Sequence, residues 1–436
     1  MLLVYSEPVT SRLRYIARLL LGDLYGIDLS FTDNPDEFTA WQGPGICYSE
    51  RPGLGGLRIH PASLLAETNL YDSPVGIDHA GGIPVLFPAA GGDLPFDVFA
   101  ASFYMVTRYE EYLNSKKDKY GRFIPSESIT LTNGFVKQPV VNLWAGMLVR
   151  QLQKRYPGLE LRPRSYKFVS TIDIDHAYAY RNRTLFRTLG GIGRSVIRAE
   201  FSQLAERFGV LAGVSRDPFD CYDFIRSFHR EQGITPHYFI LFADYGGNDN
   251  NVSLTGSSFR QLLARLSDEA VVGIHPSLSS NRHPERLERE IAGLSAATGR
   301  EITSSRQHFL KFSFPKTFRH LVTNGITDDY SMGYASVIGF RAGMASPFHF
   351  FDLFRNEVTP LLIHPVAAMD VTFRDYLHLP PAESLDQMKQ LADTVRSVNG
   401  EFITLWHNES LSDTGRWKGW RKVFEETVAY SAGLMR

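Results

Sequence analysis

The chain has little cysteine. Only Cys47 and Cys221 occur in 436 residues, and they are far apart in the sequence. Two isolated thiols exclude a disulfide framework and a cysteine zinc site with the usual ligand spacing. An excess of charge of one sign is also missing, because 46 Lys and Arg residues face 47 Asp and Glu residues and the formal net charge is -1. This balance gives no support for binding to a polyanion through bulk charge, and we expect no nucleic-acid partner.

Long apolar runs are missing as well. No stretch approaches the roughly 20 apolar residues of a membrane-spanning helix. Residues 1–7 lack the basic segment and long apolar core of a secretory signal. We therefore expect a cytoplasmic protein without a membrane span. The chain does contain 43% hydrophobic and 21% charged residues, which describes an ordinary globular protein and leaves its oligomeric state open.

The length of the chain indicates more than one domain, because 436 residues exceed one ordinary hydrophobic core. Residues 1–160 have α/β character without a catalytic motif. Their pattern stops at residues 156–165, where proline, glycine and charged residues interrupt it. The elements predicted in this first domain are a strand at residues 1–5 and helices at 11–24, 95–113 and 140–152.

The predicted helix at residues 95–113 carries a group of charges near its end. Arg108, Glu110 and Glu111 lie there beside apolar residues at helical spacing. A run of mixed charge is more often a solvated face than a functional site. We therefore expect these three side chains to be exposed.

From residue 166 onward, strand-like runs alternate with helical ones. Repeated strand-then-helix units imply a parallel sheet covered by helices, and a closed or partly closed β/α barrel fits best. The sequence thus predicts an α/β protein in which a distorted barrel at residues 166–436 follows a smaller α/β domain. An arginine-rich stretch at 181–198 is expected to form a surface helix. Predicted strands lie at 237–242, 270–274, 360–364 and 402–406, and predicted helices at 259–266, 284–297 and 385–398.

One strand, at residues 168–174, ends in charged side chains. Asp173, Asp175 and His176 are costly to bury unless they are paired or bind a metal. Asp173 and Asp175 are two residues apart, so in an extended strand both side chains leave the same face. The arrangement is favourable if a cation binds one carboxylate and the other acts as a base. The alternative is a strand end whose aspartates cap the next helix.

Two histidines follow later apolar strands in the same way. His275 comes directly after residues 271–274, and His407 directly after 402–406. In β/α barrels the carboxyl ends of the strands build the active site. We therefore expect Asp173, Asp175, His275 and His407 to meet at one rim of the barrel.

The order of these motifs resembles the polysaccharide deacetylase family, whose members are metal-dependent carbohydrate N-deacetylases on a distorted β/α barrel. The matching motifs are the acidic strand, Gly-x-His-Pro-Ser at 273–277, Arg-x-His-x-Leu at 306–310 and Leu-Trp-His at 405–407. The resemblance covers about residues 166–436 and leaves the first domain without a role.

The resemblance implies a role for each matching residue. Asp173 takes the place of the catalytic base, Asp175 that of a metal ligand and His407 that of the general acid. Arg306 corresponds to the family arginine that keeps the base ionised through a charge-assisted hydrogen bond. On sequence alone, a surface arginine is an equal alternative.

The family also uses two histidines four residues apart as metal ligands, and here the chain departs from the pattern. His275 matches the first of them, but Ser279 occupies the second position. Zinc requires nitrogen or oxygen donors without a fixed sequence spacing, so His308 is our first choice for the missing ligand. His283, His176 and a water held by Ser279 remain alternatives. The implied cofactor is a divalent metal ion, with Zn²⁺ the first choice.

Further polar residues interrupt apolar runs downstream. Asp329, Arg341 and Asp370 do so, and Trp406 lies inside the last motif. We expect Arg341, Asp370 and Trp406 to contact the substrate, and Asp329 less so. For the three charged residues, a salt bridge between barrel elements is the alternative.

The function implied by the resemblance is removal of an N-acetyl or other N-acyl group from an amino sugar or glycan. One alternative is a noncatalytic carbohydrate-binding or assembly module that has lost part of its metal site. A second is a glycosidase that uses Asp173 and Asp175. Two carboxyls on one strand do not readily flank a sugar bond at the required separation of roughly 5–9.5 Å, and His407 would have no part in that reaction.

Overall fold

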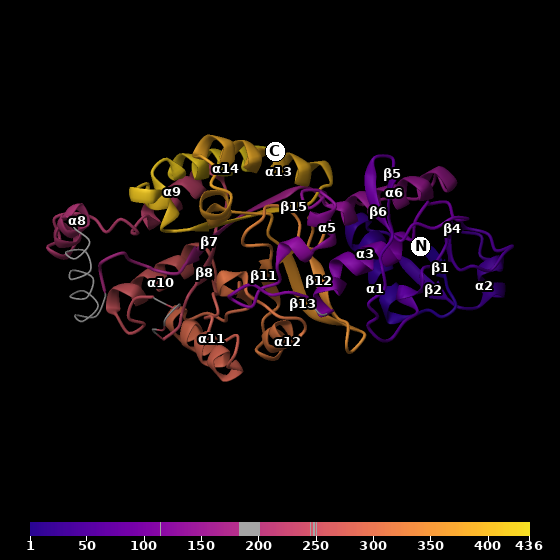
Figure 1. The fold of residues 1–436 in the computed structure, drawn as a ribbon, viewed down its shortest axis with the longest axis horizontal. Helices are drawn as coiled ribbons and strands as arrows, with labels where there is room; N and C mark the ends of the chain where they lie inside the picture. The colour runs from indigo at the N-terminus through magenta and orange to yellow at the C-terminus, as the bar shows by residue number, and fades with distance from the viewer. Residues whose placement is uncertain (114, 183–200, 245, 247–248, 250) are drawn as a thin grey trace.

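The computed structural model describes the chain except for residues 114, 183–200, 245, 247, 248 and 250. A small sheet lies in the amino-terminal part and a large one in the rest (Figure 1). The arginine-rich stretch at 181–198 falls almost wholly outside the described residues. Within the described part of the chain, no helix is both long enough and apolar enough to cross a membrane.

The small sheet has four parallel strands in the order β2-β1-β3-β4. Its central strands are buried at every position, as expected for a parallel sheet covered on both faces. Helix α2 packs on one face through Phe38, and the larger cluster on the other face includes α1, α3 and α6. The elements are β1 (Leu2–Tyr5), α1 (Ser11–Ala17, followed by a π-helical turn at Arg18–Asp23), β2 (Leu29–Thr32), α2 (Pro35–Ala40), β3 (Gly45–Tyr48), β4 (Leu57–Ile59), the hairpin β5 (Ile77–Ala80) and β6 (Ile83–Leu86), α3 (Val98–Val106) and α6 (Val140–Arg155).

The helix predicted at residues 95–113 is divided in two. Helix α3 ends at Val106, and α4 (Tyr109–Tyr112) begins after Arg108, whose φ of 55° is left-handed. The predicted exposure of three charged residues is wrong, because Arg108, Glu110 and Glu111 are 0%, 8% and 8% exposed. Burial is tolerated because the charges are paired: the Arg108 guanidinium donates to Glu111 at 2.8 Å and to Glu110 at 2.5 Å.

The large sheet has nine strands in the order β12-β13-β11-β10-β9-β8-β7-β15-β14. Its paired strands are parallel except for the antiparallel pair β12 and β13. The sheet is curled, and β12 and β14 are its two edges, so the barrel is open between them. The predicted α/β fold with a distorted, partly closed barrel is confirmed. The strands are β7 (Lys167–Ile174), β8 (His237–Ile240), β9 (Val271–Ile274), β10 (Ser304–Ser305), β11 (Asp328–Met332), β12 (Phe348–Asp352), β13 (Glu357–Pro365), β14 (Ala368–Met369) and β15 (Glu401–His407).

Helices cover the outside of this sheet (Figure 1). Helices α9, α13 and α14 pack together on one side, and α10, α11 and α12 lie on the other. A separate apolar cluster that includes Val169, Phe239 and Leu405 fills the inside of the curl. The helices are α5 (Ile129–Thr132), α8 (Phe201–Leu211), α9 (Tyr222–Gln232), α10 (Ser257–Glu269), α11 (Pro284–Thr298), α12 (Lys316–Thr323), α13 (Pro381–Ser397) and α14 (Trp420–Gly433).

The two parts of the chain share one hydrophobic cluster. The segment before α6 runs against the open side of the barrel, where the backbone N–H of Phe340 donates to Val136 O at 2.8 Å. At Gly339, whose φ is +121°, a Cβ atom would lie 2.4 Å from the same carbonyl oxygen. Only glycine therefore allows this close contact. The domain boundary near residues 156–165 stays a prediction.

Candidate active site

The strand ends of the large sheet bring four predicted residues to one rim. Strands β7, β8, β9 and β15 are parallel neighbours, so their carboxyl ends lie at the same edge. In the register of β7 and β15, Asp173 lies opposite His407. The backbone N–H of His275 donates to Ile240 O at the end of β8, 2.8 Å away. Polar side chains that follow apolar strands therefore converge, as the alternating pattern predicts.

Asp175, His275 and His308 form a group that could hold a metal ion. One ligand atom from each lies within 4.8 Å of the others. His275 Nε2 is 3.3 Å from Asp175 Oδ1, and His308 Nε2 is 3.6 Å from Asp175 Oδ2. Asp175 Oδ1 is buried without a hydrogen-bond partner among the described residues. An unsatisfied carboxylate oxygen facing two imidazole nitrogens fits a cation, because burial without a partner is costly.

Each imidazole of this group is oriented through its other nitrogen. His275 Nδ1–H donates to Arg306 O at 2.5 Å, and His308 Nδ1–H donates to Asp249 Oδ1 at 3.0 Å. Both Nε2 atoms are thereby directed towards Asp175, the arrangement that metal-binding histidines usually adopt. Asp249 in turn accepts the backbone N–H of Leu278 at 2.9 Å. The sequence interpretation missed Asp249, which lies in a polar loop well beyond the end of β8 and not directly after a strand as His275 does.

The carboxylates around the group favour a charged His308 imidazole when no metal ion is bound. Burial raises the pKa of Asp175, but His308 and His275 outweigh it and hold that pKa well below its usual value. Burial lowers the pKa of His308, but Asp175 and Asp249 raise it to about 9. A bound metal ion would replace this proton, because coordination requires an unprotonated ring nitrogen. Two imidazoles and one carboxylate are a donor set that suits Zn²⁺ or a similar divalent ion and leaves a further coordination position open.

The alternatives to His308 as third ligand are placed elsewhere. The Ser279 hydroxyl accepts a hydrogen bond from Arg286 Nη1 at 2.6 Å. The His283 side chain is 55% exposed and lies 3.6 Å from Glu285. His176 does not belong to the group of three that the described residues form. Among the candidates, His308 belongs to the group of three, with its Nε2 3.6 Å from Asp175 Oδ2.

Asp173 is held by a fully buried arginine. Arg306 Nη1 donates to Asp173 Oδ1 at 2.8 Å and to Thr171 Oγ1 at 2.6 Å, and Arg306 Nε donates to Tyr330 O at 2.9 Å. The guanidinium also lies over the Phe239 ring, 4.5 Å from its centroid. Arg306 is 0% exposed, so the alternative of a surface arginine is wrong. The contact fixes the orientation of the Asp173 carboxyl group.

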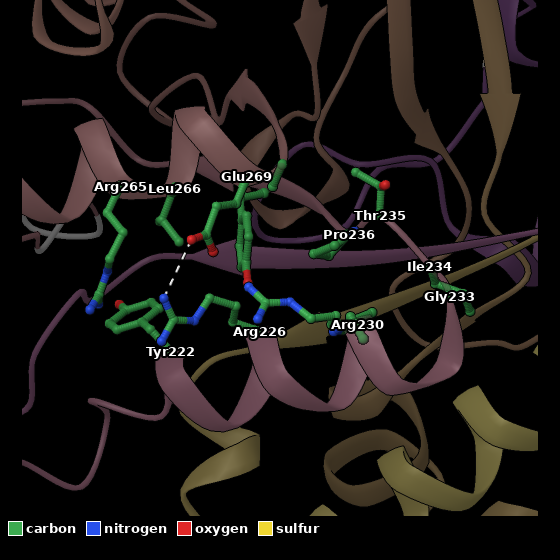
Figure 2. A pocket seen from close by; sticks show the side chains of 13 residues that line it. Tyr222, Arg226, Arg230, Gly233, Ile234, Thr235, Pro236, Arg265, Leu266 and Glu269 are labelled. Atoms are coloured by element: carbon green, nitrogen blue, oxygen red, sulfur yellow. Dashed lines mark hydrogen bonds and ion pairs between the residues drawn. The ribbon is translucent and has the colours of Figure 1, made fainter.

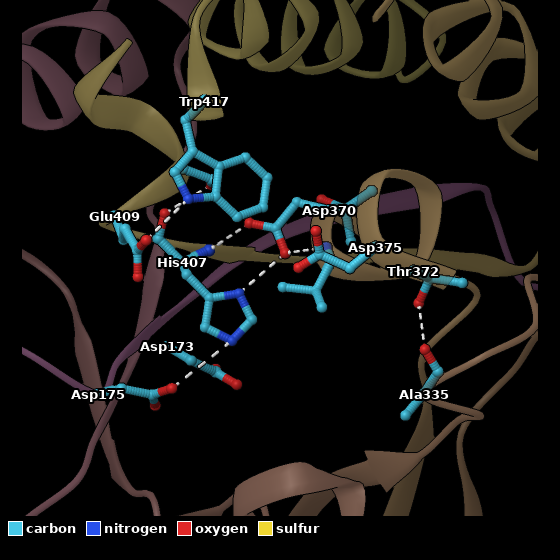
Figure 3. Close-up of polar contacts among 12 residues, drawn as sticks. Asp173, Asp175, Ala335, Asp370, Thr372, Asp375, His407, Glu409 and Trp417 are labelled. Atoms are coloured by element: carbon cyan, nitrogen blue, oxygen red, sulfur yellow. Dashed lines mark hydrogen bonds and ion pairs between the residues drawn. The ribbon is translucent and has the colours of Figure 1, made fainter. Parts of the chain in front are cut away.

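His407 is held by Asp370 (Figure 3). Asp370 Oδ1 accepts the ring Nδ1–H at 2.8 Å, and Asp370 Oδ2 accepts the backbone N–H of His407 at 2.8 Å. The free Nε2 lies 3.9 Å from Asp175 Oδ2. Burial lowers the pKa of His407, but Asp370, with smaller effects from Asp175 and Asp173, raises it to about 10. His407 therefore presents a protonated Nε2 to the carboxylates of the site.

These groups line a cavity of about 170 Å³. Polar groups occupy one side, and apolar side chains form much of the remaining wall. A small pocket that combines apolar walls with convergent polar groups is typical of a ligand-binding site. The lining residues are Arg122, Asp173, Asp175, His275, Gln307, His308, Phe309, Leu310, Ala335, Met369, Val371, Tyr376, Leu405 and His407.

Three residues expected to contact substrate do not line this cavity. Trp406 is 0% exposed and packs on Phe424 of α14, because alternate side chains of a strand point to opposite faces. Arg341 is 3% exposed and donates to Glu111. Asp370 is fully buried beneath His407. The substrate contacts of these three residues stay predictions, and Asp370 contacts His407.

Asp329, the weaker substrate candidate, is also a buried residue of the barrel. Its carboxylate accepts hydrogen bonds from the hydroxyls of Ser305 at 2.7 Å and Ser331 at 2.9 Å. Burial raises the pKa of Asp329 to about 6, although these bonds oppose the rise. Its contacts lie within the strands β10 and β11, so they support the sheet.

A larger cavity, of about 290 Å³, lies between α9 and α10 (Figure 2). Thr235, Pro236 and Ala270 line it just before β8 and β9 begin. It therefore lies at the amino ends of the strands, opposite to the metal-binding group. Its charged walls are partly paired, since Arg226 Nη1 is 3.3 Å from Glu269 Oε1. Size alone thus does not identify the reactive site.

The family-model match covers the amino-terminal part of the chain alone. Residues 2–157 match the model of a family of unknown function, DUF7033. No curated protein matches the chain. The matched range corresponds to the small sheet and its helices up to the end of α6.

Solved structures similar to the chain include members of the family that its motifs resemble. A protein from Mycobacterium smegmatis described as a polysaccharide deacetylase is 14% identical, with a TM-score of 0.40 over 61% of this chain and 85% of its own. The Puue allantoinase is 10% identical, with a TM-score of 0.36 over 60% and 83%. A mutant of a CE4 family pseudoenzyme with restored enzymatic activity is 11% identical, with a TM-score of 0.25 over 61% and 64%. Identities this low bear on the fold alone.

Proposed function

We propose that the chain is a metal-dependent hydrolase that removes an N-acetyl or other N-acyl group from an amino sugar or glycan. The observation that carries the proposal is the group Asp175, His275 and His308, whose two ring Nε2 atoms face one carboxylate. The Asp173 carboxylate and the His407 imidazole, each fixed by a hydrogen bond from or to a buried neighbour, line the same cavity.

The metal ligands in this proposal are Asp175, His275 and His308. A divalent ion bound there would lower the pKa of a coordinated water molecule and polarise the carbonyl group of the substrate amide. Arg306 and Asp249 fix the two imidazoles through their Nδ1 atoms, so the ligand geometry does not depend on flexible side chains.

Asp173 is the proposed general base. Its carboxylate lies 3.8 Å, through Oδ2, from His275 Nε2, which places it next to the proposed ligands. The ion pair with Arg306 orients the carboxylate that would accept a proton from the attacking water. Arg306 donates a hydrogen bond to the other carboxylate oxygen, Oδ1, so Oδ2 is available to accept that proton.

His407 is the proposed general acid. Asp370 holds its Nδ1, which leaves the proton on Nε2 for transfer to the departing amine nitrogen. The apolar wall formed by Leu310, Met369 and Leu405 would accommodate the short acyl group. A glycosidase would leave His275, His308 and His407 without a role.

The first prediction separates the base from the ligands. Asp173→Asn is expected to lower turnover by at least about 100-fold and to retain the metal, because it removes a proton acceptor and no ligand. Asp175→Ala and His275→Ala are expected to lose both the bound metal and turnover. Metal content is measured by elemental analysis, and amine release is measured with N-acetylglucosamine oligomers.

His283→Ala is the matched control, because it removes an exposed histidine of the neighbouring loop. It should change neither metal content nor turnover. Metal retained in Asp175→Ala and His275→Ala would contradict the ligand assignment. A protein that takes up no divalent ion after reconstitution would contradict the enzyme and favour a carbohydrate-binding module.

A further inference from the structure

A short segment of the amino-terminal part reaches the cavity of the barrel. Arg122 lines the cavity together with the proposed catalytic groups and is 9% exposed. A tight turn presents it: the Asp118 carboxylate accepts the backbone N–H groups of Tyr120 and Arg122, both at 2.9 Å. Gly121 supplies the left-handed position of the turn with φ +80°. The amino-terminal part thus contributes a wall of the site.

Three donors of the Arg122 guanidinium are occupied by protein. Nε donates to Asp118 Oδ2 at 2.7 Å, Nη1 to Phe309 O at 3.1 Å and Nη2 to the Tyr376 hydroxyl at 3.3 Å. A guanidinium has five N–H groups, so one on each Nη atom has no partner among the described residues. Phe309 directly follows the proposed ligand His308. The Arg122 guanidinium therefore contacts the backbone of the residue that follows a proposed ligand.

A second cation lies beside the same turn. Lys311 is 7% exposed, and its ammonium group has no ion pair or hydrogen bond within the described ranges of the chain. The Lys311 Nζ is 3.8 Å from the position that a Cβ atom of Gly121 would take. Burial and the charge of Arg282 lower the pKa of Lys311, while Asp118 opposes them. The residue is largely buried, but its ammonium nitrogen is not among the fully buried polar atoms that lack a partner, so the charge remains accessible to a ligand.

We propose that Arg122, which lines the cavity, and Lys311, which lies beside the same turn, form an anion-binding subsite at the edge of the cavity, so that the amino-sugar substrate carries a phosphate or carboxylate group. The inference rests on the proposed function and names its substrate class. Asp118 is the carboxylate that pairs with Arg122, and the described residues provide no ion pair for the ammonium group of Lys311. Guanidinium and ammonium donors match the oxygens of both anions.

A purely structural role for Arg122 makes a different prediction. In that case its bonds to Phe309 and Tyr376 would only support the cavity wall, and its loss would affect neutral and anionic sugars alike. The subsite instead predicts a preference for anionic sugars that depends on both Arg122 and Lys311. A comparison of sugars matched at the acetamido group separates the two roles.

The experiment uses the metal-loaded full chain and three sugars: N-acetylglucosamine 1-phosphate, N-acetylglucosaminuronic acid and the neutral methyl N-acetylglucosaminide. The kcat/KM for at least one anionic sugar should exceed that for the neutral sugar by about tenfold, chiefly through KM, because hydrogen bonds to charged groups are worth that much. Arg122→Gln and Lys311→Met should each remove most of this preference. The phosphate and carboxylate sugars show which anion fits.

Lys116→Gln is the control, because it removes an exposed cation of the same segment that pairs with Glu127. It should keep the preference. Equal kcat/KM for neutral and anionic sugars in the unmodified chain would overturn the subsite, as would a preference that survives in both variants. Thermal unfolding and metal content show whether the variants are folded. If Arg122→Gln does not fold, Lys311→Met alone decides the test.

Calorimetric binding separates the subsite from the proposed reaction. N-acetylglucosamine 1-phosphate is titrated into Asp173→Asn and into Asp173→Asn combined with Arg122→Gln. Binding that is about tenfold weaker in the double variant supports the subsite even if no sugar is hydrolysed. Equal binding in the two proteins overturns it, whatever the outcome for hydrolysis.

Discussion

Asp370 is fully buried and contacts the cavity wall through His407 and through the backbone N–H of Val371. One carboxylate oxygen holds the ring and the other holds the backbone of the same residue (Figure 3). This double contact fixes both the position of the imidazole and the nitrogen that carries its outward proton. Asp370 is therefore a positioning residue, and its charge should matter to turnover and not to metal binding.

Asp370→Asn tests this role. We expect kcat to fall by roughly 10- to 100-fold with unchanged metal content, because the amide cannot stabilise the imidazole as the carboxylate does. Steady-state amine release and elemental analysis provide the measurement. Asp375→Asn, on the neighbouring turn and paired with Arg374, is the matched control and should retain activity. Full activity in Asp370→Asn would remove Asp370 from the mechanism.

Some residues of the site could be predicted from sequence and others could not. Asp173, His275 and His407 each follow an apolar run directly, and that pattern marks the carboxyl end of a parallel strand. Asp249 belongs to the same site but pairs with His308, which lies 59 residues later. No spacing rule connects two loops that only the folded sheet brings together.

At the scale of elements, β15 shows how a strand divides its residues between two environments. Leu405 and His407 line the cavity, while Trp406 between them faces α14, 5.3 Å from the Phe424 ring centroid. The motif placed Trp406 near the substrate, but the two-residue period of the strand places it in the core. Alternation is therefore the better guide wherever a motif lies within a strand.

The charged end of the helix predicted at residues 95–113 shows where a local sequence pattern fails to predict burial. Helical spacing predicted solvent exposure there, but the partner of Glu111 is Arg341, 230 residues later. Arg341 Nε donates to Glu111 at 2.8 Å, and Arg108 Nη2 lies 3.1 Å from the Tyr334 hydroxyl. These contacts join α4 to the barrel, and the local sequence contains no sign of them.

Glu111→Gln should destabilise the fold at this junction. Removing one partner of a buried ion pair costs about 3–5 kcal/mol, because the arginines lose their counter-charge. Burial raises the pKa of Glu111, but Arg341 and Arg108 lower it to about 2. The lost stability should therefore be complete above about pH 4.5 and shrink as the pH falls towards 2.

Urea unfolding at several pH values measures the effect of Glu111→Gln. Glu127→Gln is the control, because its pair with Lys116 is exposed and should be worth less than about 1 kcal/mol. A loss of similar size in both variants would show that the junction does not depend on the buried pair.

At the scale of the whole molecule, the two ends of the large sheet carry different groups of polar side chains. The group of Asp175, His275 and His308 and the cavity lie at the carboxyl ends of the strands. Near the other end, His364 lies between Glu401 and Asp328, the first residues of β15 and β11. Its ring also stacks on Tyr330, with centroids 4.2 Å apart. In barrels the amino-terminal end usually serves stability, so this cluster should affect folding.

The pH dependence of stability follows from this cluster. Burial lowers the pKa of His364, but Asp328 and Glu401 outweigh it and raise that pKa. Because the folded pKa lies above the unfolded value of about 6.5, the contribution of His364 is complete below that pH and is lost as the pH rises through the folded pKa. The pKa values of Glu401 and Asp328 are lowered, so their contributions require a pH above about 4.5. The cluster should therefore stabilise the fold most between about pH 4.5 and 6.5.

His364→Gln tests this assignment by urea unfolding at a series of pH values. The difference in unfolding free energy between the unmodified chain and the variant should be largest near pH 6 and shrink as the pH rises to about 9, because only the protonated imidazole bridges the two carboxylates. His283→Gln changes an exposed histidine beside Glu285 and should leave the pH profile unchanged. A difference for His364→Gln that stays constant over this range would show that the ring contributes through packing on Tyr330 and not through its charge.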